Sequence, residues 1–249
     1  MKGFWPYFKL DMKMFFREPL FVIFTLLLPA LMFYIFGTMY GGNSFSGNLN
    51  YVQRFLPSQI SLILYAVGGF TLGLQIVTDK YSNAYKRLSI TPINLPMIMI
   101  SLFLRGLFIV AIAILELFVI TFLMFNIDLG QIQWGIFLLS VFVSSWMFFS
   151  LGFMIASISA KPNHALTILL LLFYPMNMLS GSMFPTESLS KLLHLLSHLV
   201  PQTYTNQVLT SAWTGNFHNY NNILDIGIIV LFSIIFIYIS KKTFRWSED

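Results

Sequence analysis

Two histidines, His194 and His198, have the spacing that comes closest to a metal site in this sequence. Side chains four residues apart on a helix lie next to each other, and Glu187 shares their face. Leucine rather than glutamate follows His194, so the pair does not form an H-E-x-x-H motif. Lys191 lies on the same face, which is typical of the solvated side of an amphipathic helix. We therefore predict no metal site.

Motifs for catalysis or phosphate binding are absent from the sequence. It contains no cysteine, which excludes disulfides, thiolate metal sites and cysteine nucleophiles. Serine and histidine occur, but without a G-x-S-x-G context. The phosphate-binding pattern G-x-x-x-x-G-K-[ST] does not occur either. The sequence therefore predicts a protein that is not an enzyme, and any ATP that it uses must be bound by another chain.

Arg105 and Glu116 stand out because they lie inside an apolar stretch, residues 97–125. An ionised group inside a bilayer costs at least about 2.5 kcal/mol on insertion scales. The two residues are separated by about 16 Å along a helix, so they cannot pair with each other. We expect Arg105 to extend its side chain to the membrane surface and Glu116 to face the bundle interior. Structural pairing with another span and a role in gating or in the substrate path both remain open.

The composition is that of a membrane protein, because 57% of the residues are hydrophobic and only 9% are charged. Ordinary soluble domains have about 25% charged residues, so a water-soluble or disordered chain is excluded. A bilayer crossing takes about 20 apolar residues of helix. We predict one all-α membrane domain over residues 1–249, with six transmembrane helices at residues 19–39, 55–78, 97–125, 129–160, 162–186 and 223–240.

The positive charges predict the orientation. Eleven of the 14 Lys and Arg residues fall in segment 1–17, in loops 78–96 and around Lys161, and after residue 240, all on one side of the predicted membrane. Cytoplasmic loops carry such an excess of Lys and Arg. Both termini are therefore expected to be cytoplasmic, in a multi-pass protein of the cell membrane. The sequence pI of about 9.4 could suggest a nucleic acid partner, but the positions of the cations indicate a membrane instead, so we predict no nucleic acid partner.

Segment 1–17 is predicted to form an interfacial amphipathic helix. On a helical projection the aromatic rings occupy an arc of about 120° and the cations a separate arc of about 80°. The apolar arc holds Phe4, Trp5, Phe8, Met12, Phe15 and Phe16, and the cationic arc holds Lys2, Lys9, Lys13 and Arg17. Such a helix places its rings at the acyl boundary and its cations toward headgroups or an acidic protein surface. Membrane anchoring and contact with a partner protein are compatible alternatives.

Two loops are also predicted to carry structure. In loop 78–96, the prolines at 92 and 96 limit a short helix to residues 81–89, which would present Tyr85 and its neighbours to the cytoplasm. The alternative is a loop that only sets topology. On the outer side, residues 181–217 are predicted to form a re-entrant pair of helices, the first of them a leucine-rich amphipathic helix between Pro185 and Pro201.

Several polar or helix-breaking residues lie within the predicted spans. Pro29 and Pro175 invite kinks in the first and fifth spans. Gln75, Tyr174 and Asn177 could line a path for an amphiphilic substrate. Polar residues in membranes also hold helices together, and the sequence alone does not separate these two roles.

Three groups of motifs follow one another along the chain. They are Arg17-Glu18-Pro19 at the first span, Tyr85-Lys86-Arg87-Leu88 followed by Thr91-Pro92, and Gly181-Ser182-Met183-Phe184-Pro185 followed by Pro201-Gln202-Thr203-Tyr204. Their order and spacing, together with six predicted spans, resemble the ABC-2 type permeases, the membrane subunits of ATP-binding-cassette exporters. The resemblance covers the whole chain.

The resemblance implies partners as well as a fold. Members of the family work as dimers of six-span subunits, either identical or paired with a related chain, surrounded by membrane lipids. Each subunit binds a cytoplasmic ABC ATPase that holds ATP and Mg, so no cofactor is expected on this chain. The residues that would contact the ATPase are Tyr81, Tyr85, Lys86, Arg87 and Leu88. The re-entrant motif would be marked by Gly181, Pro185 and Pro201.

The predicted function is that of the permease subunit of an ATP-driven exporter, in a bacterial cell membrane, for hydrophobic or amphiphilic cargo such as a drug, an antimicrobial peptide or a lipid. A subunit that exports lipid-linked polysaccharide is an alternative within the same family. An ion-coupled secondary transporter is an alternative from another class, and it would show repeated halves with helices broken at matching positions.

Overall fold

The computed structural model describes residues 4–40, 51–85, 95–125, 130–182, 190–217 and 220–243, and all regular structure within them is helical, as predicted. Lys86, Arg87, Leu88 and Pro185 lie outside these ranges. The elements are α1 (Phe4–Arg17), α2 (Pro19–Val22), η1 (Ile23–Leu27), α3 (Leu28–Tyr40), α4 (Tyr51–Tyr65), η2 (Ala66–Gly73), α5 (Leu74–Tyr81), α7 (Leu95–Phe125), α8 (Trp134–Ile158), α9 (Pro162–Leu179), α10 (Lys191–Ser197), α11 (Pro201–Trp213) and α12 (Tyr220–Thr243).

Four helical stretches of the described residues are long and apolar enough to cross a membrane, which makes this an integral membrane protein. They are Val52–Tyr81, Met97–Phe125, Trp134–Ile158 and Asn221–Thr243, where the second, third, fourth and sixth spans are predicted. The consecutive segments α2, η1 and α3 lie where the first span is predicted, and α9 lies where the fifth is predicted. The total of six spans stays a prediction.

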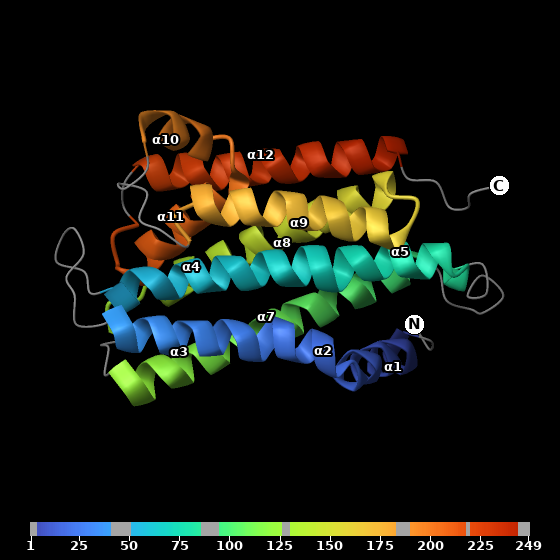
Figure 1. The fold of residues 1–249 in the computed structure, drawn as a ribbon, viewed down its shortest axis with the longest axis horizontal. Coiled ribbons are helices and arrows are strands. Elements are labelled where there is room, and N and C mark those ends of the chain that lie inside the picture. The colour runs from blue at the N-terminus through green and yellow to red at the C-terminus, as the bar shows by residue number, and fades with distance from the viewer. Residues whose placement is uncertain are drawn as a thin grey trace.

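The long helices lie side by side along the bundle, and the short ones gather at its two ends (Figure 1). At one end, which we call the α1 end, lie α1, the last turn of α5 and the last turn of α12 (Figure 1). At the opposite end, the α11 end, lie α10 and α11 (Figure 1). The segments predicted to be cytoplasmic thus adjoin one end of the bundle. The side of the membrane that this end faces stays a prediction.

The stretch Val52–Tyr81 forms the centre of the bundle. Its most apolar part is 78% buried, against 28% for Asn221–Thr243. Tyr65 of this stretch is fully buried, and its hydroxyl donates a hydrogen bond to the carbonyl oxygen of Leu169 on α9 at 2.8 Å. The second predicted span therefore packs mainly against protein, whereas the sixth exposes most of its surface.

Two π-helical segments occur, η1 where the first span is predicted and η2 within the stretch Val52–Tyr81. In η1 the N–H of Leu28 bonds to the carbonyl oxygen of Ile23, five residues earlier. Pro29 follows directly, has no N–H and displaces the carbonyl four residues before it, which explains why the helix widens there. The kink predicted at Pro29 thus corresponds to a π-helical turn. Pro175 lies inside α9 without ending it.

The second π-helical segment, η2, contacts α8 through glycines. A Cβ atom added to Gly68 would lie 2.6 Å from the carbonyl oxygen of Phe148, and one added to Gly152 would collide with the carbonyl oxygen of Gly68. Small residues let membrane helices approach closely enough for backbone contact. The glycines of η2 therefore fix the distance between the second and fourth predicted spans.

The short helices differ in extent from the prediction. Tyr81 ends α5 rather than beginning a separate helix, because the chain turns at Ser82 and Asn83, where Asn83 has a positive φ of 56°. At the α11 end, α10 covers only seven residues, after a cap in which the Ser190 hydroxyl accepts from the N–H of Leu193. Pro201 begins α11, where a proline fits the first turn.

Candidate functional site

Arg105 is the most completely buried charged residue described, with 1% of its side chain exposed. It lies on α7 and donates two hydrogen bonds, both 2.5 Å long: Nη1 to Oδ1 of Asp11 on α1, and Nη2 to Oε1 of Gln75 on α5. The expectation that Arg105 extends to the membrane surface is wrong. Arg105 instead pairs with residues of other helices. Through Arg105, Asp11 and Gln75, the N-terminal helix α1 is joined to the spanning helices α7 and α5.

Asp11 is the member of this cluster that the sequence analysis missed. It is 3% exposed and forms an ion pair with Arg105. Burial raises the pKa of the Asp11 carboxyl group, while the Arg105 guanidinium and the Gln75 side chain lower it. On the helical projection Asp11 falls beside Phe4 and Phe15, on the side away from the cations. A single carboxylate on the apolar side of a helix indicates a buried cation on a neighbouring helix, and this was the pattern in the sequence that could have identified the pair.

The cluster continues toward the predicted ATPase contacts through Tyr85. Tyr85 is only 9% exposed, so the expectation that it projects into the cytoplasm is wrong. Burial raises the pKa of its hydroxyl, and the nearby Asp79 and Tyr7 add to the rise. The phenol therefore stays protonated at neutral pH. Tyr81, on the last turn of α5, is 57% exposed and is accessible to a partner.

The helix α1 turns different residues toward the bundle and toward the surroundings. Asp11 and Phe15 are buried, whereas Trp5 and Phe16 stay exposed. Phe4, Trp5 and Phe8 contact one another, with ring centroids 6.1 Å apart. The three cations of this helix, Lys9, Lys13 and Arg17, are exposed. The predicted helix is present, and one edge of its apolar face is occupied by the bundle.

Glu116 lies apart from the charge cluster. It is half-buried at a groove between η1 and α7, whose other lining side chains, such as Val22, Leu26 and Val119, are apolar. It therefore lies at a helix–helix boundary rather than in the bundle interior that we expected.

The neutral polar residues at the α11 end form a second buried network. The Gln202 amide nitrogen donates to Oδ1 of Asn177 at 2.8 Å and to the hydroxyl of Ser182 at 3.1 Å. The Asn206 amide nitrogen donates to the same hydroxyl at 2.8 Å and to the carbonyl oxygen of Ser180 at 2.9 Å. These bonds join α11 to the end of α9, so side-chain amides hold this region in place.

The predicted path residues and re-entrant motif residues can be placed against this network. Asn177 and Gln75 both bond within the subunit, which is the helix-joining role, and Tyr174 is exposed on α9. Gly181 has a φ of 82°, in the left-handed region where glycine is favoured, and makes the turn that brings Ser182 under α11. A hydrophilic cavity of about 410 Å³ adjoins the network, with Asp225 in its lining.

The two histidines lie on and directly after α10, with ring centroids 5.2 Å apart. Glu187, the third residue of the pattern, lies outside the described ranges.

Comparison with known proteins gives two findings. The model of the ABC-2 type transporter family matches residues 3–213. Nodulation protein J of Neorhizobium galegae is 30% identical to this chain over 99 residues, which are 39% of this chain and 37% of that protein. The alignment thus spans little more than a third of the length of that relative.

Proposed function

Because this chain belongs to the ABC-2 type transporter family, we propose that it is the membrane-spanning permease subunit of an ATP-driven exporter. The cargo is hydrophobic or amphiphilic, and a separate cytoplasmic ABC ATPase binds ATP and Mg and hydrolyses the nucleotide. A second copy of this chain, or a related permease, completes the transporter in the cell membrane of a bacterium. Both termini of the chain lie in the cytoplasm.

The observation that carries this proposal is the ion pair between α1 and α7, next to the last turn of α5. Removing one partner of a buried ion pair typically costs about 3–5 kcal/mol. The ion pair of Asp11 with Arg105 therefore keeps α1 and α7 together when one of these helices is displaced. The hydrogen bond from Arg105 to Gln75 joins α5 to the same unit. A force applied at the α1 end reaches the centre of the bundle, because α5 continues into η2 and α4.

The surface that receives the force is the exposed end of α5 with the segment that follows it. Tyr81 is exposed there, and tyrosine and arginine are enriched among the residues that contribute most to binding in protein interfaces. In this proposal Tyr81, Lys86, Arg87 and Leu88 contact the ATPase. Tyr85, which is buried, positions this segment against the charge cluster instead of contacting the ATPase directly.

Charge reversal in the coupling segment tests the proposal. The full chain is co-expressed with the ATPase that co-purifies with it and is reconstituted in liposomes, and ATP hydrolysis and cargo movement are measured together. Lys86→Glu with Arg87→Glu is expected to abolish export while leaving membrane insertion intact. The matched control is Lys161→Glu, because Lys161 lies on the same predicted side but on the α8–α9 connection.

Two results would contradict the proposal. Cargo movement driven by a proton or sodium gradient without any ATPase would show a secondary transporter. Export that is unchanged in the double variant would remove Lys86 and Arg87 from the ATPase contact.

A further inference from the structure

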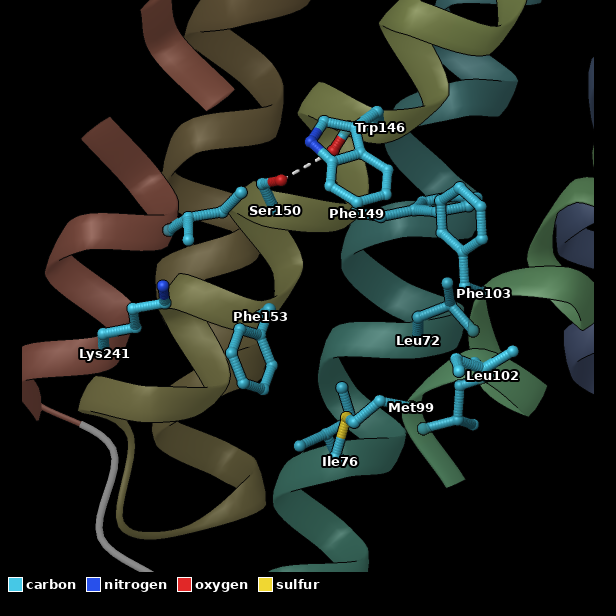
Figure 2. A pocket seen from close by; sticks show the side chains of 12 residues that line it. Leu72, Ile76, Met99, Leu102, Phe103, Trp146, Phe149, Ser150, Phe153 and Lys241 are labelled. Atoms are coloured by element: carbon cyan, nitrogen blue, oxygen red, sulfur yellow. Dashed lines mark hydrogen bonds between the residues drawn. The ribbon is translucent and has the colours of Figure 1, made fainter. Parts of the chain in front are cut away.

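An apolar groove opens on the surface of the bundle between α7 and α12 (Figure 2). It has a volume of about 330 Å³, and α8 and the junction of η2 with α5 form its floor. Ten of its twelve lining side chains are hydrophobic, and the other two are Ser150 and Lys241. Ile100 and Trp146 stand at its rim, each about half exposed, so the groove is open to whatever surrounds the bundle.

The groove offers hydrocarbon contact and little else along its length. The Ser150 hydroxyl already donates to the carbonyl oxygen of Trp146 at 2.7 Å, as Figure 2 shows. Leu72 and Phe149 close the floor by lying against Gly106, where an added Cβ would be 2.8 Å from the Leu72 Cδ1 and 2.7 Å from the Phe149 Cζ. A ligand with polar groups along its body would leave them without partners, so the chemistry suits an alkyl chain.

One cation stands at the edge of this apolar surface. Lys241 is in the last turn of α12, four residues after Ile237, and the two share the face of α12 that lines the groove. Figure 2 shows Lys241 at one edge of the cavity and the rings of Trp146, Phe149 and Phe103 farther along it. Lys242 is rotated by about 100° around the helix and does not line the groove. Among the residues that the structure describes, no carboxylate lines the groove.

The length of the groove suits the part of one acyl chain that lies nearest its headgroup. Trp146 and Phe153 line the groove from positions seven residues apart on α8, a distance of roughly 10 Å along the helix axis. The hydrocarbon part of one leaflet is about 15 Å deep, half of the bilayer core. A chain in the groove would thus leave its headgroup near the end of α12, where Lys241 stands.

We propose that this groove binds one acyl chain of an anionic phospholipid, with the phosphate of its headgroup against the Lys241 ammonium group. A lysine at the membrane surface attracts an anionic headgroup, and the zwitterionic headgroup of phosphatidylcholine gains little from the same contact. The bound lipid joins α12 to α7 across α8. This inference does not depend on the proposed function, since binding is measured without an ATPase.

Lipid retention by the full chain tests the inference. The detergent-purified protein is incubated with equal amounts of dioleoyl phosphatidylglycerol and dioleoyl phosphatidylcholine, and retained lipid is counted by native mass spectrometry. The wild type is expected to keep one phosphatidylglycerol in preference to phosphatidylcholine. Lys241→Gln should reduce this preference about fivefold, as expected for one lysine–headgroup contact, whereas the neighbouring variant Lys242→Gln should keep it.

A second variant separates the groove from the charge. Ile100→Trp places a larger side chain at the rim and should lower the retention of both lipids, because the acyl chain loses its space. Equal retention of the two lipids by the wild type would overturn the proposal. So would an equal loss in Lys241→Gln and Lys242→Gln, which would indicate a general attraction to basic residues, or unchanged retention in Ile100→Trp.

Discussion

At each end of the bundle a short helix is held against the long helices, but the two ends use different kinds of polar contact. At the α1 end, a helix that does not cross the bundle is held by the ion pair of Asp11 with Arg105, and the same guanidinium also donates to Gln75 on α5. At the α11 end, another such helix is held by several neutral bonds from the amides of Gln202 and Asn206. Both networks are buried, so each had to replace hydrogen bonds to water.

The difference lies in how the energy is distributed. A buried ion pair concentrates it in one contact, since loss of either partner leaves an unpaired charge in an apolar site. A neutral network spreads it over several bonds, each with a net value of about 1 kcal/mol. The α1 end is therefore expected to respond as a unit to a single change, and the α11 end to lose stability in small steps.

Removing the carboxylate of Asp11 is expected to have the largest effect. Asp11→Ala leaves the Arg105 guanidinium buried without its counter-ion, so the free energy of unfolding should fall by about 3–5 kcal/mol. Thermal unfolding in detergent measures the change. Glu18→Gln is the control, because Glu18 is an exposed carboxylate one residue after α1. Equal unfolding temperatures for the two variants would show that the ion pair contributes nothing.

A double variant separates stability from coupling at the same end. Asp11→Leu with Arg105→Met removes both charges, and apolar replacement of a buried ion pair is often neutral or stabilising. Unfolding should therefore return close to that of the wild type. If the ion pair transmits force as proposed, cargo moved per ATP should still fall, because apolar contacts are not directional. Full coupling in this variant would assign the pair a structural role only.

Gln202→Ala at the α11 end is expected to cost less. It leaves Oδ1 of Asn177 without its donor and removes a second bond to Ser182, for a loss of about 1–3 kcal/mol. Gln207→Ala, an exposed glutamine on the same helix, serves as the control and should stay within about 0.5 kcal/mol of the wild type. A loss as large as that of Asp11→Ala would remove the proposed difference between the two ends.

The sequence predicted the helical class and the positions of the four long spans, because hydropathy over about 20 residues is a local property. It also identified Arg105 as costly, since a charge in an apolar stretch is visible without a fold. It did not identify the partner. Asp11 lies 94 residues earlier in the chain, and its pairing depends on how α1 lies against α7. The sequence marks Gln75 only as a polar residue within a span, because its bond to Arg105 has the same non-local origin.

The helix contacts and the amide network were missed for a related reason. Gly68 and Gly152 are ordinary residues in a sequence with 15 glycines, and only the packed bundle shows that their backbones meet. At the α11 end, the motif containing Gly181 and Gln202 is visible in the sequence only as a resemblance. Its physical basis is the positive φ of Gly181 and the bond from Gln202 to Asn177. Local patterns located these residues, and three-dimensional packing gave them partners.

Gly181→Ala tests the turn that supports the neutral network and should have a smaller effect than Gln202→Ala. A Cβ in the left-handed region costs about 1–2 kcal/mol, and all four side-chain bonds can still form. The matched control is Gly135→Ala, because Gly135 lies on α8 with nothing within 4 Å of an added Cβ. That control should be neutral or slightly stabilising, since alanine favours helix over glycine. Equal losses in both variants would contradict the role of the turn.

The smallest effect is expected at a hydrogen bond that lies at the α11 end but at its surface. The Tyr204 hydroxyl donates to the carbonyl oxygen of His198 at 2.7 Å in an exposed position, where water can replace the lost partner. Tyr204→Phe should therefore lower the free energy of unfolding by only about 0.5 kcal/mol. If unfolding shows a loss as large as that of Gln202→Ala, burial would not be what gives the amide network its value, and the contrast between the two ends would have to rest on charge alone.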